Sequence, residues 1–304
     1  MELNYKIIVV TPTYNRKSTL PKLYQSLKNQ NKKDFVWLII DDGSSDDTRE
    51  YVEKISRENE IIINYIYQDN GGKGRALNKA FTFFETASLY VIVDSDDYLL
   101  NDAIENVQKY IDKYKDVENI GAFFFHYKTE DGNVIKPTGN IISKDKVMTR
   151  YEYNNKYKQN DGCVCYFGRA VKKYKYPEFQ GEKYVGPTVI QLLMANEYKM
   201  VFSPEVIGVA EYQENGLTQV GRKLRMKNPL GMLFYSGLQQ SERASFKTRI
   251  KNSIGAQAYR FISNLDRQAL INYDLTKYLR GWALFPGLFL KMYWTTKHEK
   301  GRIK

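Results

Sequence analysis

Three carboxylates stand close together where an apolar run of the sequence ends. Asp94, Asp96 and Asp97 directly follow the run YVIV at residues 90–93. Like charges at this spacing repel one another, so such a cluster is typical either of a site for a hard divalent cation or of a helix start, where carboxylates accept backbone N–H groups. The motif on its own leaves both interpretations open, with Asp97 or Asn101 as the helix cap in the second.

A second acidic cluster, DDGSSDDT at residues 41–48, follows another apolar run. Acidic side chains at strand ends accept hydrogen bonds from nucleotides, which makes Asp41 or Asp42 a candidate for contact with a base edge or a ribose. Ser44 and Asp47 also have the spacing of a capping box, so a purely structural interpretation stays open.

Two further motifs carry hydroxyl groups, an aromatic ring and cations. Residues 11–16 (TPTYNR) follow the first apolar run, and a helix start at such a place favours phosphate. Residues 70–75 (NGGKGR) form a glycine-rich turn with two cations, which indicates either phosphate contact or a flexible basic loop. The turn lacks the spacing of a P-loop and of a dinucleotide fingerprint, which argues against P-loop enzymes and dinucleotide-dependent oxidoreductases.

The elements that must position these motifs alternate between strand-like and helix-like patterns, which predicts βαβ units and a mostly parallel sheet. Each motif follows one strand, and the carboxyl ends of such strands form the ligand crevice of open α/β sheets. The pattern predicts helices near 101–115 and 188–198, and it marks 130–160 as polar and rich in turns. Strands are expected at 6–10, 35–40, 61–67, 90–93, 121–127, 164–167 and 200–202.

The order and placement of the four motifs resemble glycosyltransferase family 2. Residues 11–16, 41–48, 70–78 and 94–97 look like that family's successive N-terminal motifs, the last being its DxD-type element. The resemblance is strong over residues 5–100 and looser to about residue 218. It implies the α/β GT-A fold, Rossmann-like with a mostly parallel mixed sheet flanked by helices. It also implies inverting transfer of a monosaccharide from a nucleoside-diphosphate sugar, commonly a uridine one.

The resemblance also implies roles for single residues. Thr11, Tyr14 and Asp42 would contact the nucleoside, while Lys73 and Arg75 would lie near the nucleotide.

The DxD-type element would bind the metal. Asp94 would hold the ribose or a metal-bound water, and Asp96 would be the direct ligand of Mn²⁺ or Mg²⁺ bridging the diphosphate. A hard divalent ion on carboxylate and phosphate oxygens neutralises the charge that grows on the leaving group.

Inversion also needs a general base for the acceptor hydroxyl. In the family this is often a carboxylate in an acidic pair just before the helix expected near residue 188, where this chain has Gly186 and Pro187. We expect Glu182, the nearest acidic residue upstream, to act as the base, with Asp161 and Glu178 as further options. A surface-loop acid without a catalytic role is the alternative for Glu182. Residues 211–218 resemble a late segment of bacterial family members near the acceptor.

Charge divides the chain of 304 residues into two parts. The net charge is +11, but residues 1–218 hold 29 basic and 31 acidic side chains, whereas residues 219–304 hold 17 basic and 4 acidic ones. We therefore expect a GT-A catalytic domain at 1–218, with a nucleotide-sugar part at 1–100 and an acceptor part at 101–218. The rest, 219–304, is expected to be a basic amphipathic helical region.

The basic region combines cations with aromatic residues in the stretch LRGWALFPGLFLKMYW at 279–294. Such composition favours a bilayer interface with anionic lipid, and the alternative is a helical appendage packed on the body. No recognised RNA or DNA module accompanies the charge, so no nucleic-acid partner is expected.

The cysteine content, the apolar runs and the first residues indicate where in the cell the protein is located. Two cysteines cannot form a secreted disulfide framework, no run reaches the roughly 18 apolar residues of a spanning helix, and the start lacks a basic leader region. We expect a cytoplasmic enzyme attached to the inner face of the cell membrane, acting on a glycan or lipid-linked acceptor in surface-polysaccharide synthesis. A sugar nucleotidyltransferase and a non-catalytic membrane-associated scaffold are the rival interpretations.

Overall fold

The computed structural model describes residues 6–84, 87–135, 142–157, 161–210 and 217–299. The chain divides into two compact units. The first, here called the sheet unit, comprises residues 1–175 and 194–212, and the second, the helical unit, comprises residues 176–193 and 213–304.

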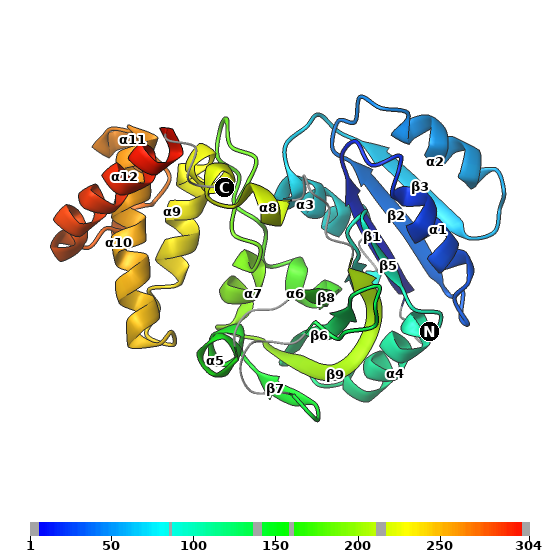
Figure 1. Cartoon of the computed structure of the whole chain (residues 1–304). Coiled ribbons are helices and arrows are strands. Elements are labelled where there is room, and N and C mark those ends of the chain that lie inside the picture. The colour runs from blue at the N-terminus through cyan, green and yellow to red at the C-terminus, as the bar shows by residue number, and fades with distance from the viewer. Residues whose placement is uncertain (1–5, 85–86, 136–141, 158–160, 211–216, 300–304) are drawn as a thin grey trace. The chain divides into compact units, whose positions relative to one another are not determined.

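The sheet unit is built on one mixed sheet of nine strands (Figure 1), which confirms the predicted α/β fold with a mostly parallel half. Strands β1 to β4 are parallel in the order β3-β2-β1-β4. The path continues with β8-β6-β9-β5, and β7 also pairs with β9. The strands are β1 (Lys6–Thr13), β2 (Phe35–Asp41), β3 (Ile62–Tyr67), β4 (Ala87–Ile92), β5 (Asp97–Leu99), β6 (Ile120–Lys128), β7 (Lys146–Met148), β8 (Gly162–Phe167) and β9 (Lys199–Ala210).

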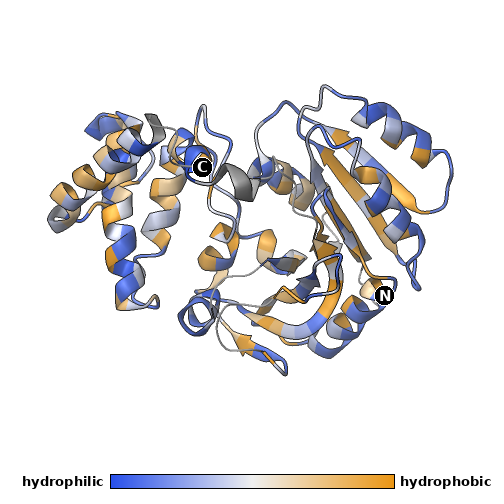
Figure 2. Cartoon of the chain, viewed as in Figure 1, coloured by the Kyte–Doolittle hydropathy of each residue, from blue (hydrophilic) through white to orange (hydrophobic). Residues whose placement is uncertain are grey.

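Helices cover both faces of this sheet. α1, α2 and α4 contribute apolar side chains to one continuous core with alternate residues of the strands. α3 contacts β1 and β2 on the opposite face, where the rings of Phe81 and Tyr90 pack edge to face. Every residue of β2 is buried, as the unbroken apolar run predicts for a strand covered on both sides, and the strands are coloured mainly as apolar in Figure 2. The helices of this unit are α1 (Leu20–Lys28), α2 (Thr48–Ser56), α3 (Lys73–Phe83), α4 (Ala103–Tyr114), α5 (Arg150–Lys156) and α6 (Gly168–Val171).

The second half of the sheet differs from the sequence expectation. β9 runs over 12 residues instead of the three predicted, and its register with β6 shifts between the pairs Phe124–Phe202 and His126–Val206. Pro204 lies inside this irregular stretch, and proline cannot donate to a strand ladder, so the pattern breaks although the strand continues. α5 begins at a capping box of Thr149 and Glu152 within the region expected to be turns.

The helical unit consists of short helices packed around α9, α10 and α12. Their apolar residues form one cluster, in which the rings of Tyr259 and Trp294 lie 5.1 Å apart. In the described part of the chain, no helix has the length and apolar character needed to cross a bilayer. The elements are α7 (Val189–Met194), α8 (Leu217–Lys227), α9 (Pro229–Leu238), α10 (Phe246–Ser263), α11 (Arg267–Asn272), η1 (Thr276–Tyr278), η2 (Gly281–Ala283) and α12 (Leu284–Glu299).

The segment 176–193 corrects the expected domain boundary. The charge distribution along the sequence predicts a catalytic domain that ends at residue 218 and includes this segment, whereas in the structure the segment belongs to the helical unit. Asn228 explains the difference, because its side-chain oxygen accepts the N–H groups of Lys183 at 2.8 Å and Tyr184 at 3.1 Å. Phe179 belongs to the same apolar cluster as α9 and α10.

Candidate active site

The four motifs meet at one edge of the sheet. Pairing in register brings Thr13 beside Asp41 and Asp41 beside Tyr67, while Val10 pairs with Ile92 near the end of β4. Because β1 to β4 are parallel, their carboxyl ends and the polar segments that follow lie side by side, at the place where open α/β sheets bind ligands.

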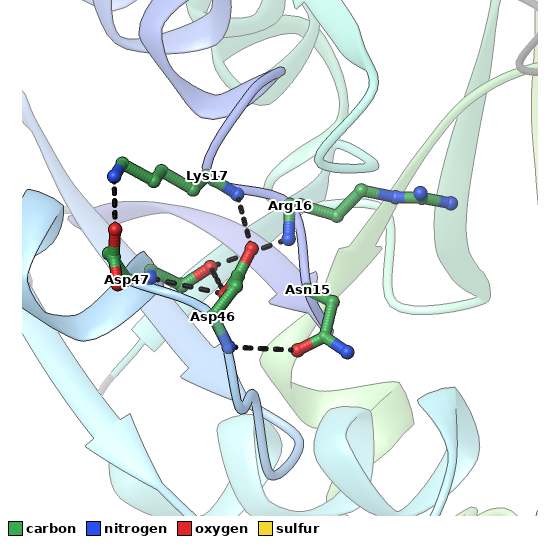
Figure 3. Close-up of polar contacts among 6 residues, drawn as sticks. Asn15, Arg16, Lys17, Asp46 and Asp47 are labelled. Atoms are coloured by element: carbon green, nitrogen blue, oxygen red, sulfur yellow. Dashed lines mark hydrogen bonds and ion pairs between the residues drawn. The ribbon is translucent and has the colours of Figure 1, made fainter.

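Hydrogen bonds tie the first loop to the second (Figure 3). The backbone N–H of Asn15 donates to the Ser44 hydroxyl at 2.9 Å, and the Asn15 side-chain oxygen accepts the Ser45 N–H at 2.8 Å. The Lys17 N–H donates to the Asp46 carboxylate at 3.1 Å, and the Lys17 ammonium pairs with Asp47. Asn15 adopts a φ of 51°, a left-handed conformation that asparagine tolerates better than most residues.

This contact replaces the capping box expected at the start of α2. Asp47 is the N-cap residue of α2, but its side chain makes no capping hydrogen bond. Ser44 is instead engaged with Asn15, and Asp46 accepts the Thr48 N–H at 3.1 Å. The serine and the acids therefore fasten two loops together.

Asp42 holds the glycine-rich turn in place. One carboxylate oxygen accepts the Gln68 amide at 2.7 Å and the Gly71 N–H at 2.8 Å, and the other accepts the Gly72 N–H at 2.7 Å. Gly72 has a φ of +90°, which side chains rarely adopt. Oδ2 has capacity for one more donor, so Asp42 both shapes the turn and can still accept a ligand group.

The side chains of Thr11 and Tyr14 point to different environments. Thr11 is fully buried, and its hydroxyl accepts the indole N–H of Trp37 at 2.9 Å, so this side chain joins β1 to β2 and has no surface for a nucleoside. Tyr14, three residues later, is 48% exposed and offers its ring. Of the two predicted contacts in this motif, the geometry favours Tyr14.

The acidic turn after β4 is flanked by two cations from the other motifs. The Lys73 ammonium lies 2.5 and 2.7 Å from the two carboxylate oxygens of Asp94, and the Arg16 guanidinium lies 3.9 Å from Asp96. Burial lowers the pKa of Lys73, but the attraction of Asp94 outweighs it and the net pKa is raised. Lys73 therefore stays charged beside the turn.

Burial and neighbouring negative charge raise the pKa values of two carboxylates in this turn. Burial raises the pKa of Asp96, and the negative charge of Asp94 adds to the rise. Burial together with Asp94 and Asp96 raises the pKa of Asp97 to about 9. The N-cap residue of α4 is Asp102, whose side chain makes no capping hydrogen bond, so neither Asp97 nor Asn101 is the helix cap that the alternative interpretation requires.

The donor set of the turn fits a divalent cation. Carboxylate oxygens are the ligands that Mn²⁺ and Mg²⁺ prefer. After burial, the negative charge of Asp94 contributes to the raised pKa values of Asp96 and Asp97, and a bound cation would offset that repulsion. Among the described residues no three His, Cys, Asp or Glu side chains converge as a complete ligand set. Oxygens from a diphosphate would have to complete the coordination.

Arg75 lies on α3 near the same turn. A Cβ on Gly71 would come within 2.6 Å of Arg75 Cδ, so the arginine side chain folds over this glycine. A glycine is also required at Gly43, where φ is +84° and a Cβ would lie 2.7 Å from the Asn70 nitrogen. The predicted Lys73 and Arg75 thus belong to one packed loop.

The two candidate bases lie in different units. Glu182 belongs to the helical unit, where its two oxygens accept the N–H groups of Leu230 at 2.7 Å and Gly231 at 2.8 Å and cap α9. Asp161 belongs to the sheet unit, directly before β8, and its charge contributes to the raised pKa of Asp97. The Glu182 carboxylate, which the sequence predicts to be the base, is therefore engaged in a structural contact. The segment 211–216 lies outside the described residues.

Sequence reasoning passed over Asn15 and Arg16 as individual site residues. Both stand in the quoted motif, but their partners, Ser44 and Asp96, are 29 and 80 positions away along the chain. The only available signal was the motif itself, because contacts at such separation are set by the sheet.

Comparison with known proteins gives one family. The model of glycosyl transferase family 2 matches residues 8–177, more than half of the chain. A segment of 155 residues is 30% identical to GalNAc(5)-diNAcBac-PP-undecaprenol beta-1,3-glucosyltransferase of Campylobacter jejuni, covering 49% of this chain and 47% of that protein. A segment of 111 residues is 31% identical to poly(ribitol-phosphate) beta-N-acetylglucosaminyltransferase TarS of Staphylococcus aureus, covering 36% and 19%. The matches thus span less than half the length of either relative.

Solved structures share the fold. S. aureus TarS 1–349 in complex with UDP-GlcNAc superposes with a TM-score of 0.63 at 16% identity, covering 98% of this chain and 92% of that one. Mannosyltransferase PcManGT from Pyrobaculum calidifontis, in complex with GDP-Man and Mn²⁺, gives a TM-score of 0.55 at 14% identity, covering 96% and 88%.

Proposed function

The chain belongs to glycosyl transferase family 2, and from this membership we propose that it transfers a monosaccharide from a nucleoside-diphosphate sugar, with UDP as the nucleotide, to a glycan or lipid-linked acceptor. The observation that carries the proposal is the acidic turn of Asp94 and Asp96, set between Lys73 and Arg16 at the carboxyl edge of the sheet. UDP is favoured because TarS, of the same fold, is described with UDP-GlcNAc.

We assign the donor to the loops that Asp42 organises. The exposed ring of Tyr14 can stack on the base, and Asp42 has one remaining acceptor position for a base or ribose group. Lys73 and Arg75, on the first turn of α3, can bind diphosphate oxygens, because cations and a helix N-terminus both favour anions. These residues would fix the sugar with its anomeric carbon toward the acceptor.

Asp96, with Asp94 beside it, would hold Mn²⁺ or Mg²⁺ together with the diphosphate. Such an ion, when bound, acts as a Lewis acid that neutralises charge on the departing diphosphate. Inversion then requires one base to remove the proton from the acceptor hydroxyl as that oxygen attacks from the face opposite the leaving group. We favour Asp161 for this role, because it lies in the sheet unit near Asp97 while both Glu182 oxygens are occupied.

The acceptor and the place of reaction belong to the same proposal. The name of the C. jejuni relative specifies an undecaprenol-linked compound, and that of TarS specifies a poly(ribitol-phosphate). The first acceptor is lipid-linked and the second is a polymer. We therefore place the reaction in surface-polysaccharide synthesis, with the enzyme attached to the inner face of the cell membrane.

Calorimetric titration with UDP tests the assignment of the metal site. We expect UDP to bind in the presence of Mn²⁺ and to lose at least tenfold in affinity when the ion is removed by a chelator. Asp96→Asn should give the same loss in the presence of Mn²⁺, because one charged ligand is missing. Asp112→Asn, an exposed acid on α4, is the matched control and should bind as the unaltered protein does. Equal binding by the Asp96 variant would contradict the metal assignment.

Turnover tests the reaction itself. A panel of nucleotide sugars should reveal one donor that the protein hydrolyses slowly in the presence of Mn²⁺, releasing UDP, since water can replace the missing acceptor. Release of pyrophosphate instead would indicate a nucleotidyltransferase, and no turnover with any donor would favour a scaffold.

A further inference from the structure

α12 is apolar on the side that packs against the helical unit. Ala283, Gly287, Leu290 and Trp294 follow helical spacing and lie toward the other helices. Gly287 allows a close approach to α10, since a Cβ there would come within 2.4 Å of Gln257 Cβ. This inner side accounts for the attachment of the helix.

The opposite side of α12 is apolar as well. We call its exposed residues, with Trp282 just before the helix, the outer face. Two phenylalanines dominate it, Phe285 at 70% and Phe289 at 69% exposure. An amphipathic surface helix would present polar groups here, and a helix that is apolar all round is normally covered on both sides. Figure 2 shows the apolar colouring along α12. The outer face consists of Trp282, Phe285, Leu288, Phe289, Met292 and Tyr293.

The outer face is held rigidly from behind. The Arg222 guanidinium lies 4.2 Å from the centre of the Trp294 ring and donates to the Tyr259 hydroxyl at 3.0 Å. The Gln257 amide donates to the Arg280 carbonyl at 2.9 Å, just before Trp282. These contacts anchor the inner side of α12 and the backbone just before it.

Positive charge predominates in the part of the sequence that carries this face. Between residues 243 and 298 the sequence has ten Lys and Arg residues and two acidic ones, and no acidic residue stands between Asp274 and Glu299. A second copy of this chain would bring the same excess of positive charge to the contact, which disfavours self-association through this face. The partner that covers the outer face must instead have an apolar interior and an anionic surface.

We propose that the outer face of α12 inserts into the interfacial layer of an anionic lipid bilayer. Trp and Tyr are enriched at the depth of the headgroups, and Phe, Leu and Met bury apolar area below them. Lys291 and Lys297, on the same helix, can bind lipid phosphates while their stems cover apolar surface. The inference deepens the membrane attachment that the proposed function includes, but it does not depend on the proposed reaction, because the contact needs neither donor nor acceptor.

Vesicle sedimentation of the full chain tests the proposal. We expect binding to phosphatidylcholine vesicles containing about 30% phosphatidylglycerol, weaker binding to pure phosphatidylcholine, and a decrease as salt is raised. The double substitution Phe285→Ser and Phe289→Ser should reduce binding to the anionic vesicles about tenfold or more. Phe246→Ser is the matched control, since Phe246 is also 70% exposed but lies at the start of α10. This control should bind as the unaltered protein does.

The fluorescence of Trp282 gives an independent readout. The difference spectrum between the unaltered protein and Trp282→Phe isolates this residue from the buried Trp37 and Trp294. We expect that spectrum to shift to shorter wavelength when anionic vesicles are added, because the indole leaves water.

Three results would overturn the proposal. In the first, the unaltered protein does not bind anionic vesicles. In the second, Phe246→Ser reduces vesicle binding as much as the double substitution does. In the third, the unaltered protein sediments as an oligomer without vesicles, and the double substitution abolishes that oligomer. The double variant should retain Mn²⁺-dependent UDP binding. Failure of this inference can thus be told apart from failure of the proposed reaction.

Discussion

Glu182 and Asp42 show how a carboxylate's hydrogen bonds define its use. Each accepts two backbone N–H groups, Glu182 at the start of α9 and Asp42 in the glycine-rich turn. Burial raises the pKa of Glu182, although the N–H groups of Gly231 and Leu230 oppose the rise. A base must accept a proton from the substrate, and an acid already bound to two N–H groups is a poor candidate.

The first prediction separates capping from catalysis at Glu182. In Glu182→Gln an amide NH₂ replaces one acceptor and faces a backbone N–H, so we expect the free energy of unfolding to fall by about 1–2 kcal/mol. The kcat for donor turnover should change less than severalfold. Urea denaturation and donor hydrolysis measure the two effects, and Glu118→Gln, an exposed acid of the sheet unit, is the control.

Substitution of Asp161, in contrast, should affect catalysis. We expect Asp161→Asn to lower kcat for transfer to an acceptor by about 10²- to 10⁴-fold, the usual range for a lost general base. A large loss of kcat in the Glu182 variant with full activity in the Asp161 variant would reverse the assignment.

At the scale of elements, Asp145 ties α4 to the segment before β7. It accepts the hydroxyl of Tyr110 at 2.6 Å and the ammonium of Lys113 at 2.8 Å, and Tyr110 also contacts the Ser203 hydroxyl of β9 at 2.6 Å. Burial raises the pKa of Asp145, but the Lys113 and Tyr110 donors outweigh it and the net pKa is lowered. The carboxylate form therefore stabilises the fold.

This lowered pKa predicts the pH dependence of Asp145→Asn. The folded pKa lies below the unfolded value of about 3.9, so the stabilisation is complete at higher pH and is lost as pH falls through the folded pKa. We expect the free energy of unfolding of the variant to be about 1–2 kcal/mol lower than that of the unaltered protein at pH 7. This difference should become smaller toward pH 3. Urea denaturation across this range measures it. Asp116→Asn on the exposed end of the same region should show no such difference, and a gap independent of pH would contradict the prediction.

At the scale of the whole molecule, the helical unit contains a piece of the chain from between two parts of the sheet unit. Residues 176–193 supply Phe179 to the helical cluster and bind Asn228 through two backbone N–H groups. A protein cut at the boundary suggested by charge would leave this segment without its partners.

Truncation at residue 212 tests this organisation. We expect the chain 1–212 to expose Phe179 and its neighbours, and hence to bind the dye ANS severalfold more strongly than the full chain and to aggregate at lower temperature. Light scattering during heating and ANS fluorescence measure both effects. A truncated chain that matches the full chain in both would show that the segment folds without the helices.

Much of the fold and the outline of the site could be predicted from the sequence. The four apolar runs became parallel strands, and the motifs after them met at one edge, because parallel strands necessarily align their carboxyl ends. β5, of three residues, and the irregular β9 were missed or underestimated, since their pairing partners, not their own periodicity, define them.

The sequence by itself determined the family, the order of the motifs and the separation of positive charge into the C-terminal part, because these depend on residue type and position alone. Only the tertiary structure decided that Thr11 bonds to Trp37, that Ser44 joins Asn15, and that Glu182 caps α9. It also decided that Phe285 and Phe289 face outward. Each of these outcomes depends on a contact, or on the lack of cover, set by elements distant in the chain, and local sequence contains no record of those partners.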